Sequence, residues 1–581
     1  MAGLIVDTPS GRLRGRRQGG VAAFKAVPYA ASAAGDGRFA PPRPPAPWAG
    51  VRDATEWGPW APQWQRPVSQ PGFFAAILPG YGRPRPMSED CLALNLWTPA
   101  TDDGRRPVLV WLHGGGFETG GPSYGDRSDG AALARTGDVV VASVTHRLGV
   151  LGFTDLADLA GPSDLSDRSD LSDLSGVAGR SGSSGAGNAD LAGSGNAGMA
   201  DVVAALAWLR DHVHLFGGDP GNVTVFGESG GAMKVLTLLA MPSAAGLFHR
   251  AVCQSPMPTY GWTATQAGRR RDAVLRALGL ARPGEGGGRW GGGEAAGRAL
   301  VDRLRAVPAD ELVAADARLA TAADATATTV TAYGPLVGGG DLPVAPQEAV
   351  AGGCRPEVPV LIGTNRDEWR LYLAAQPGFA DLGYDDVVRR LAPALDGAAR
   401  AATVVAAYRD ARPEATAGQV LVAVESDRLF RLPVADLADR RAAARAAGAA
   451  GAAGAGGAAG AGGVAGAAGA VVFSYLFSWC SPAVPQAGAS HGLETPLVFG
   501  NPSSCAATAG VPGAARLARR MSAAWVAFAR QGAPGHPGLP EWAPYEPGRR
   551  ATMVFDDDCA VVDDPLGALR DAWAQGGPRV S

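Results

Sequence analysis

A serine in the segment Gly227–Gly231 (Gly-Glu-Ser-Gly-Gly) has the surroundings of a nucleophile. The four residues before the segment, Val223–Phe226, are apolar and β-prone, and a run compatible with a helix follows from Met233 to Leu239. A serine on such a strand-to-helix turn lies on a sharp, strained bend with its hydroxyl above the sheet. Glycine at both ends of the segment suits a turn where the strand and helix backbones approach closely. The pattern predicts Ser229 as a nucleophile for acyl transfer.

The Gly-x-Ser-x-Gly pattern occurs twice more in a chain that contains 83 glycines. The other copies lie at Gly121–Gly125 and Gly488–Gly492. Neither follows a continuous apolar strand, and Pro122 would interrupt a ladder in the first copy. Any single match could be a plain glycine turn, so the context favours Ser229.

A serine hydroxyl needs a base to take its proton and usually an acid to fix that base. Of seven histidines, His491 is the one in a loop shortly after a predicted core strand, 471–477. Two acids, Asp367 and Glu368, come just past another predicted strand, 358–363, and spacing alone leaves both open. The order serine, acid, histidine is typical of α/β-hydrolases.

A glycine run after a buried strand predicts an anion-binding loop. Residues 108–113 are almost wholly apolar, and Gly114, Gly115 and Gly116 follow before Phe117. Three glycines free the backbone to point successive N–H groups into one space, and the N–H of Gly230 opens the helix after the serine. Strands predicted at 91–97, 108–113 and 139–144 alternate with helical stretches such as 200–212, which favours a mostly parallel sheet with helices on both faces.

The length of 581 residues would permit several domains, but we expect one domain, 1–581, with long loop insertions. Residues 155–195 contain an Asp/Leu/Ser repeat and a Gly/Ser tract, which indicates a low-complexity insertion. Residues 442–470 are almost pure Ala and Gly and are predicted to be a flexible insertion. Residues 39–86 are rich in Pro and Trp, so we expect an ordered loop whose aromatics either anchor it or line an apolar substrate gorge.

Composition excludes several classes of partner. The net charge is −3 with 18% charged residues, so we expect neither nucleic acid nor an anionic membrane surface as a partner. No apolar run is long enough to span a bilayer, and the N-terminus lacks the features of a secretory signal. The six cysteines are dispersed without metal-ligand spacing, which favours reduced thiols, a cytoplasmic protein and no bound metal.

The chain resembles the type-B carboxylesterase family, which contains cholinesterases and bacterial para-nitrobenzyl esterases. The resemblance spans nearly the whole chain and rests on ordered motifs at 24–30, 88–95, 111–117, 147–153, 195–198, 216–222, 226–231, 363–368 and 491–500. It implies an α/β-hydrolase fold with Ser229 as nucleophile, Glu368 as triad acid and His491 as base. It also implies that Gly115, Gly116 and Gly230 donate to the oxyanion, and that Glu228 and Phe117 contact the substrate.

The activity implied by this resemblance is that of a bacterial serine carboxylesterase, which hydrolyses small ester molecules through an acyl-enzyme without a cofactor. A carbamate or amide hydrolase of the same mechanism is the nearest alternative. A non-catalytic, cholinesterase-like binding protein is a more distant one. We expect a monomer or a homodimer.

Several positions depart from the family pattern. Relatives usually have alanine at Gly230 and a small serine at Lys234, and the usual cysteine partner of Cys91 is absent. If Lys234 faces the core, it needs a carboxylate partner or a lowered pKa.

Overall fold

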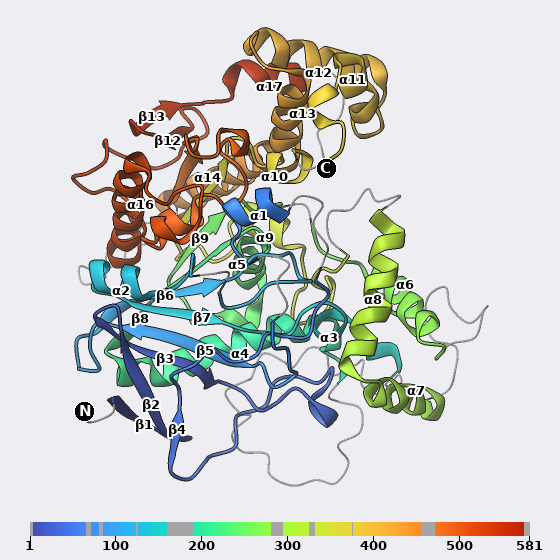
Figure 1. Cartoon of the computed structure of the whole chain (residues 1–581), viewed down its shortest axis with the longest axis vertical. Helices are drawn as coiled ribbons and strands as arrows, with labels where there is room; N and C mark the ends of the chain where they lie inside the picture. Colours follow the sequence, from blue (N-terminus) through green and yellow to red (C-terminus); the bar gives the residue numbers. More distant parts are fainter. Residues whose placement is uncertain are drawn as a thin grey trace.

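The computed structural model describes residues 4–65, 71–80, 85–123, 126–159, 191–258, 260–280, 294–324, 332–374, 376–454 and 471–574. One twisted sheet runs through the centre of this structure, with helices on both of its faces (Figure 1). The neighbouring strands follow the order β1-β2-β3-β5-β7-β6-β8-β9-β10-β11-β12-β13, and β4 pairs with β2 outside this path. The strands are β1 (Leu4–Thr8), β2 (Gly11–Gln18), β3 (Val21–Pro28), β4 (Val51–Asp53), β5 (Ala93–Thr98), β6 (Arg106–Leu112), β7 (Val140–Val144), β8 (Gly218–Glu228), β9 (Arg250–Gln254), β10 (Val360–Asn365), β11 (Val472–Phe477), β12 (Ala551–Phe555) and β13 (Ala560–Asp563).

The middle of the sheet is parallel and its ends are antiparallel. The consecutive strands β7, β6, β8, β9, β10, β11 and β12 pair in parallel with one another. Strands β1, β2, β3 and β5 at one end, and β13 at the other, pair antiparallel. Because the carboxyl ends of parallel strands share one edge, the loops after β6, β8, β10 and β11 meet there. The predicted fold class is confirmed.

Each central strand separates two hydrophobic cores, as strand β6 shows. Val108, Val110 and Leu112 join one core, and the alternate residues Leu109 and Trp111 join the other. Helices α4 and α5 pack into the first core, whereas α2 and α16 pack into the second. A strand buried on both faces must be apolar at every position, which explains the continuous apolar runs in the sequence.

The helices of the structure have the following bounds. They are α1 (Pro71–Ile77), α2 (Ala131–Gly137), α3 (Gly149–Phe153), α4 (Ala197–His212), α5 (Gly230–Ala240), α6 (Ala264–Ala277), α7 (Glu294–Ala306), α8 (Ala309–Asp324), α9 (Pro346–Ala351), α10 (Arg370–Leu373), α11 (Tyr384–Leu391), α12 (Ala398–Ala411), α13 (Ala417–Ser426), α14 (Leu432–Gly454), α15 (Thr495–Val498), α16 (Pro512–Gln531) and α17 (Gly567–Ala574). A π-helical turn, η12 (Asp427–Arg431), joins α13 to α14.

Helices α11, α12, α13 and α17 form a third core at one end of the molecule (Figure 1). Trp573 of α17 packs into this core, and its indole N–H donates to Tyr408 Oη of α12 at 3.0 Å. Tyr408 in turn donates to the buried carboxylate of Asp427. Helix α17 is therefore linked through Tyr408 to the π-helical turn η12.

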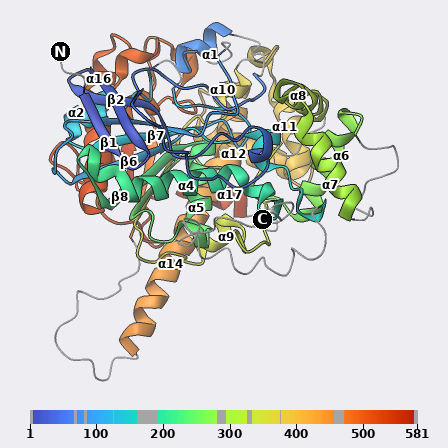
Figure 2. The same ribbon diagram turned by 90° about the horizontal axis from the view of Figure 1, so that it is seen from below.

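The two predicted insertions have different outcomes. Helix α14 continues to Gly454 and projects from the body (Figure 2), so the structure has helix where 442–454 was expected to be flexible. The alanines of this stretch favour helix enough to extend α14 despite the glycines. Residues 455–470 and most of the 155–195 segment lie outside the described residues.

The aromatics of the Pro- and Trp-rich loop mainly anchor it. Trp57 packs on Trp97 of β5 at 5.8 Å between ring centroids, and Phe73 and Phe74 of α1 pack against the second core. Trp48 packs against the first core. These contacts support the first of the two alternatives for this loop.

A buried ion pair ties the segment after β7 to α4. The guanidinium of Arg147 donates to both carboxylate oxygens of Asp201, at 2.6 and 2.8 Å, and also to the carbonyl of Ala40 at 2.7 Å. All six cysteines are free thiols. Within the described residues, no helix is both long and apolar enough to cross a membrane.

Candidate active site

Ser229 lies on the turn between β8 and α5 with φ 58° and ψ −123°. Positive φ is strained for a residue with a side chain and persists only where the surroundings impose it. Here the N–H of Ser229 donates to the carbonyl of Gln254 in β9 at 2.8 Å, and its carbonyl accepts from the N–H of Met233 at 3.0 Å. The neighbouring strand and the first turn of the helix therefore fix the serine in the bend predicted from the sequence.

The glycines on either side of the serine leave no room for side chains. A methyl group on Gly227 would lie 2.5 Å from the backbone carbon of Gly231. One on Gly231 would overlap the carbonyl oxygen of Leu112 in β6. The close approach of strand and helix expected at both positions is confirmed.

Glu368, and not Asp367, contacts the imidazole of His491. Glu368 Oε2 lies 2.5 Å from His491 Nδ1, and Glu368 Oε1 accepts from the N–H of Asn365 at 2.7 Å. Asp367 instead accepts from the N–H of Ala489 at 2.9 Å and pairs with Arg366 at 2.9 Å. Glu368 and His491 are both buried, so their contact is shielded from water.

The other nitrogen of the imidazole faces Glu228. His491 Nε2 lies 3.1 Å from Glu228 Oε1, and in the part of the chain that the structure describes it has no hydrogen bond, to Ser229 or to any other group. Phe430 of η12 and Tyr372 of α10 pack on the ring, at 5.2 and 5.9 Å between centroids. The structure thus brings the predicted base to the residue that precedes the predicted nucleophile.

Three carboxylates determine the charge of His491. Burial by itself lowers the pKa of His491, but Glu228, Glu368 and Glu494 outweigh it and raise the pKa to about 9. Burial also raises the pKa of Glu228, against the opposing effects of His491 and Arg127. The site therefore favours an imidazolium held between carboxylates at neutral pH.

The predicted oxyanion donors come together beside the elbow. Gly115 and Gly116, in the loop after β6, have φ of 92° and 65°, which glycine adopts readily. Gly230, in the first turn of α5, packs directly on the backbone of Gly116. No hydrogen bond between described residues uses the N–H of Gly115 or Gly116, and a first-turn N–H has no acceptor within its own helix. These three donors are therefore available to an anion.

Comparison with known proteins identifies the family. The carboxylesterase family model matches residues 2–167 and 186–568. The chain belongs to the carboxylesterase family. Para-nitrobenzyl esterase of Bacillus subtilis is 30% identical over 97% of both chains, and phenmedipham hydrolase of Pseudarthrobacter oxydans is 32% identical over 96% of both. A solved carboxylesterase of Geobacillus stearothermophilus, 33% identical, matches 98% of this chain and 99% of its own with a TM-score of 0.74. The present chain is therefore, like these relatives, a serine hydrolase of carboxylic esters.

Phe117 is fully buried in this carboxylesterase, although it was predicted to contact substrate. Its ring packs on Phe153 at 5.2 Å and on Tyr260 at 5.7 Å between centroids. The ring of Phe117 therefore packs into the first hydrophobic core and anchors the glycine loop to it. Glu228, the other predicted substrate contact, lies beside His491, as described above.

Sequence reasoning missed several groups that hold the candidate active site together. The side chain of Asn365 donates to Glu494 Oε2 and to the carbonyl of Ser490, each at 2.7 Å, and Arg127 donates to the carbonyl of Gly492. The position of Asn365 at a strand end is a signal that could have identified it. Nothing in the sequence near Phe430 marks it as a neighbour of His491.

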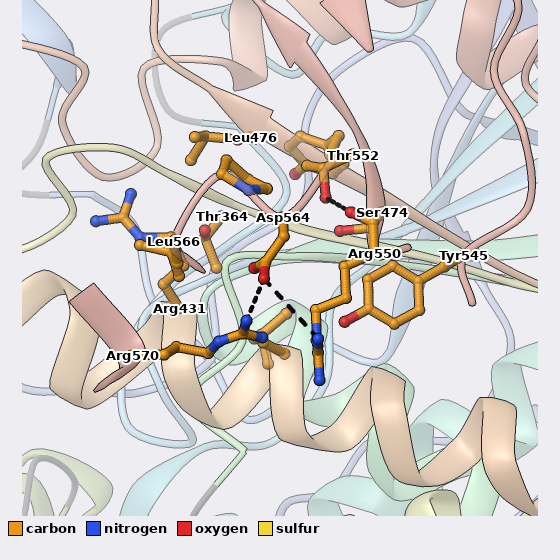
Figure 3. A pocket seen from close by; sticks show the side chains of 14 residues that line it. Thr364, Arg431, Ser474, Leu476, Tyr545, Arg550, Thr552, Asp564, Leu566 and Arg570 are labelled. Atoms are coloured by element: carbon orange, nitrogen blue, oxygen red, sulfur yellow. Dashed lines mark hydrogen bonds and ion pairs between the residues drawn. The ribbon is translucent and has the colours of Figure 1, made fainter. Parts of the chain in front are cut away.

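A separate pocket, partly open to solvent, lies at β10, β11 and β12, next to α14 (Figure 3). Asp564 accepts from Arg570 and pairs with Arg550 at its wall. None of the predicted site residues lines this pocket, so we do not assign the esterase site to it. Within the described residues, no cluster of His, Cys, Asp or Glu is arranged to hold a metal ion.

Proposed function

We propose that Ser229 is the nucleophile of this carboxylesterase, His491 its general base and Glu368 the acid that orients the base. The observation that carries this proposal is the 2.5 Å contact between His491 Nδ1 and Glu368 Oε2, with Nε2 of the same ring 3.1 Å from Glu228, the residue before the strained Ser229. A carboxylate on Nδ1 fixes the tautomer whose Nε2 can accept a proton. Nε2 moves from Glu228 to Ser229 Oγ when substrate binds, since catalytic hydrogen bonds commonly tighten only in the Michaelis complex.

The reaction follows from these positions. Neutral His491 takes the proton of Ser229 as Oγ attacks the ester carbonyl carbon, and the N–H groups of Gly115, Gly116 and Gly230 bind the resulting oxyanion. The carbon–oxygen bond to the alcohol then breaks, and the alcohol leaves with the proton from His491. Water attacks the acyl-enzyme and gives a proton to His491, which returns it to Ser229 as the carboxylic acid departs.

The test is hydrolysis of para-nitrophenyl acetate and butyrate by the purified protein, followed by mass spectrometry after treatment with an organophosphate. We expect turnover of both esters, and one phosphoryl group on Ser229 in proportion to the activity lost. A folded protein that neither turns over nor is labelled would contradict the proposal and favour a binding protein. Phenmedipham is a second substrate to test, because a 32% identical relative is named as its hydrolase; it addresses the substrate range.

Glu228→Gln is expected to move the rising limb of kcat/KM to lower pH. The base must be neutral, and with a pKa of about 9 only about 1% of His491 is neutral at pH 7. Among the single charge effects that raise this pKa, that of Glu228 is the largest, so removing its charge lowers the pKa of His491. The measurement is kcat/KM from pH 6 to pH 10.

The comparison variant is Glu494→Gln, whose carboxylate contributes less to the pKa of His491 and which should move the limb less. A profile of Glu228→Gln that coincides with that of the wild type would mean that Glu228 does not control the charge of His491.

Other predictions from the sequence stay proposals. We propose a cytoplasmic location, which the six free thiols support. A monomer or homodimer, the bacterial origin, substrate contacts by Glu228 and Phe117, and activity on carbamates or amides also stay predictions.

A further inference from the structure

Lys234 of α5 is fully buried beneath the glycine loop. Its Nζ donates to the carbonyl of Gly116 at 2.8 Å and to the carbonyl of His113 at 3.1 Å. No ion pair between described residues includes Lys234, so these backbone carbonyls hold its polar end. The partner of this lysine is thus the loop that carries two of the predicted oxyanion donors.

The two carbonyls lie at the two ends of the three-glycine segment. The carbonyl of His113 belongs to the peptide unit between His113 and Gly114. The carbonyl of Gly116 belongs to the peptide unit between Gly116 and Phe117. Between them lie the two peptide units that carry the N–H groups of Gly115 and Gly116. Glycine adopts many backbone conformations at similar cost, so this segment needs external contacts to hold one of them. A donor that binds both ends restricts the orientation of the N–H groups between them.

The surroundings suit an amine that binds carbonyls in either protonation state. Burial lowers the pKa of Lys234 to about 7, with Glu228 opposing the shift. The stacked imidazoles of His113 and His146, 4.8 Å apart, have pKa values lowered by burial and by the charge of Lys234, so both are neutral. A neutral amine has two N–H groups and an ammonium has three, and either number serves two carbonyls.

Gly230 allows the loop to come this close to α5. A methyl group at Gly230 would lie 2.5 Å from Gly116 Cα and closer still to its nitrogen and oxygen. The backbone of Gly116 therefore occupies the volume that a side chain at position 230 would need. Gly230 and Lys234 therefore contact the same loop residue, Gly116. Gly230 packs on its backbone because it lacks a side chain, and Lys234 donates to its carbonyl.

We propose that Lys234 is a positioning residue of the oxyanion hole, which holds the Gly114–Gly116 segment against α5 at the distance that Gly230 permits. This inference rests on the proposed function, in which the segment binds the oxyanion. Lys234 touches no reacting atom and acts through the orientation of the N–H groups of Gly115 and Gly116.

The test compares Lys234→Met with Thr237→Val. Methionine keeps an unbranched side chain of similar length but removes the N–H donors. Thr237 lies further along the same helix, is buried, and bonds Met233 and Tyr260 without touching the loop, so its variant reports a purely structural loss. For Lys234→Met we expect kcat for para-nitrophenyl butyrate to fall roughly 10- to 100-fold with little change in KM, somewhat less than the loss of a whole oxyanion donor. Thr237→Val should lose stability but keep kcat.

A second readout is the affinity for an alkyl trifluoromethyl ketone, which forms a tetrahedral adduct on the serine and so needs the oxyanion hole. Lys234→Met should weaken this inhibitor by about the factor lost in kcat, because both depend on the same donors. A folded Lys234→Met with wild-type kcat and inhibitor affinity would overturn the proposal, and so would a loss confined to KM.

Gly230→Ala provides an independent route to the same loop, and it decides the matter if Lys234→Met does not fold. The added methyl group displaces Gly116, so kcat should again fall with little change in KM. In the double variant the losses should combine to less than their product, because both changes release one contact. The proposal would be contradicted if the two fold-losses in kcat multiplied fully in the double variant, or if Gly230→Ala left kcat unchanged. Failure of the proposed function is recognised separately, since the wild type would then take no organophosphate label on Ser229.

Discussion

Ser229→Ala is expected to lower kcat for para-nitrophenyl acetate on the order of 10⁶-fold, the size of loss that follows removal of a triad nucleophile. Alanine cannot form the acyl-enzyme, and the remaining rate comes from water attacking an ester held at the oxyanion donors, roughly 10³- to 10⁴-fold above solution. The variant removes one oxygen from an elbow whose backbone bonds to Gln254 and Met233 stay intact. Initial rates, with circular dichroism to show that the variant is folded, measure the effect.

The other two Gly-x-Ser-x-Gly serines provide the matched controls. Ser123 Oγ accepts from the N–H of Asp126 at 3.3 Å, and Ser490 Oγ is buried without a hydrogen bond in the described part of the chain. Neither lies on a strand-to-helix elbow. Ser123→Ala and Ser490→Ala should therefore keep kcat within a few-fold of the wild type. Loss of activity in one of them, together with an active Ser229→Ala, would move the nucleophile to that serine.

Glu368→Gln is expected to lower kcat on the order of 10⁴-fold, with a smaller change in KM. The amide has nearly the size of the carboxylate, but it can present N–H groups to His491 Nδ1 and so favour the tautomer whose Nε2 already carries a proton. It also removes one of the charges that stabilise the imidazolium formed in the reaction. Steady-state kinetics across the pH range of the wild-type profile measure both effects.

Asp367→Asn is the control for this change, because it makes the same substitution of an acid by an amide one residue away. Asp367 binds Arg366 and the N–H of Ala489 and does not contact His491. We expect its kcat to stay within about tenfold of the wild type. Equal losses in both variants would show that the effect comes from the turn after β10 and not from the acid on the imidazole.

The sequence predicted the strand-to-helix bend at Ser229 well because its constraints are local. A β-prone run, two glycines without room for side chains and a helix start all lie within one short segment. The strands β6, β7 and β10 were also predicted, since strands buried on both faces must be apolar throughout. Strand β12, Ala551–Phe555, was not predicted. It is short and follows a Pro-rich stretch.

Groups held by distant segments could not be predicted in the same way. The choice between Asp367 and Glu368 depends on how the turn after β10 meets residues 489–491, and only the family resemblance indicated the glutamate. The acceptors of Lys234 are backbone carbonyls, which no residue type marks; of the two alternatives expected for a buried Lys234, a carboxylate partner or a lowered pKa, the structure supports the lowered pKa. Phe430 reaches His491 from a π-helical turn in a region, 376–441, where no helix or strand was predicted from the sequence.

The order of strands in the sheet has a consequence for synthesis on the ribosome. From β8 to β13, each new strand joins the edge left by the strand before it, so this half of the sheet can grow as the chain emerges. Until it is complete, the nascent protein exposes an unpaired edge of apolar strands, which invites pairing with other chains. Strand β13 ends this growth because it is short, antiparallel and largely solvent-exposed, and its final residue is the charged Asp563. Chains that stop before residue 560 would keep β12 open, so the last strand protects the finished enzyme from association through its sheet.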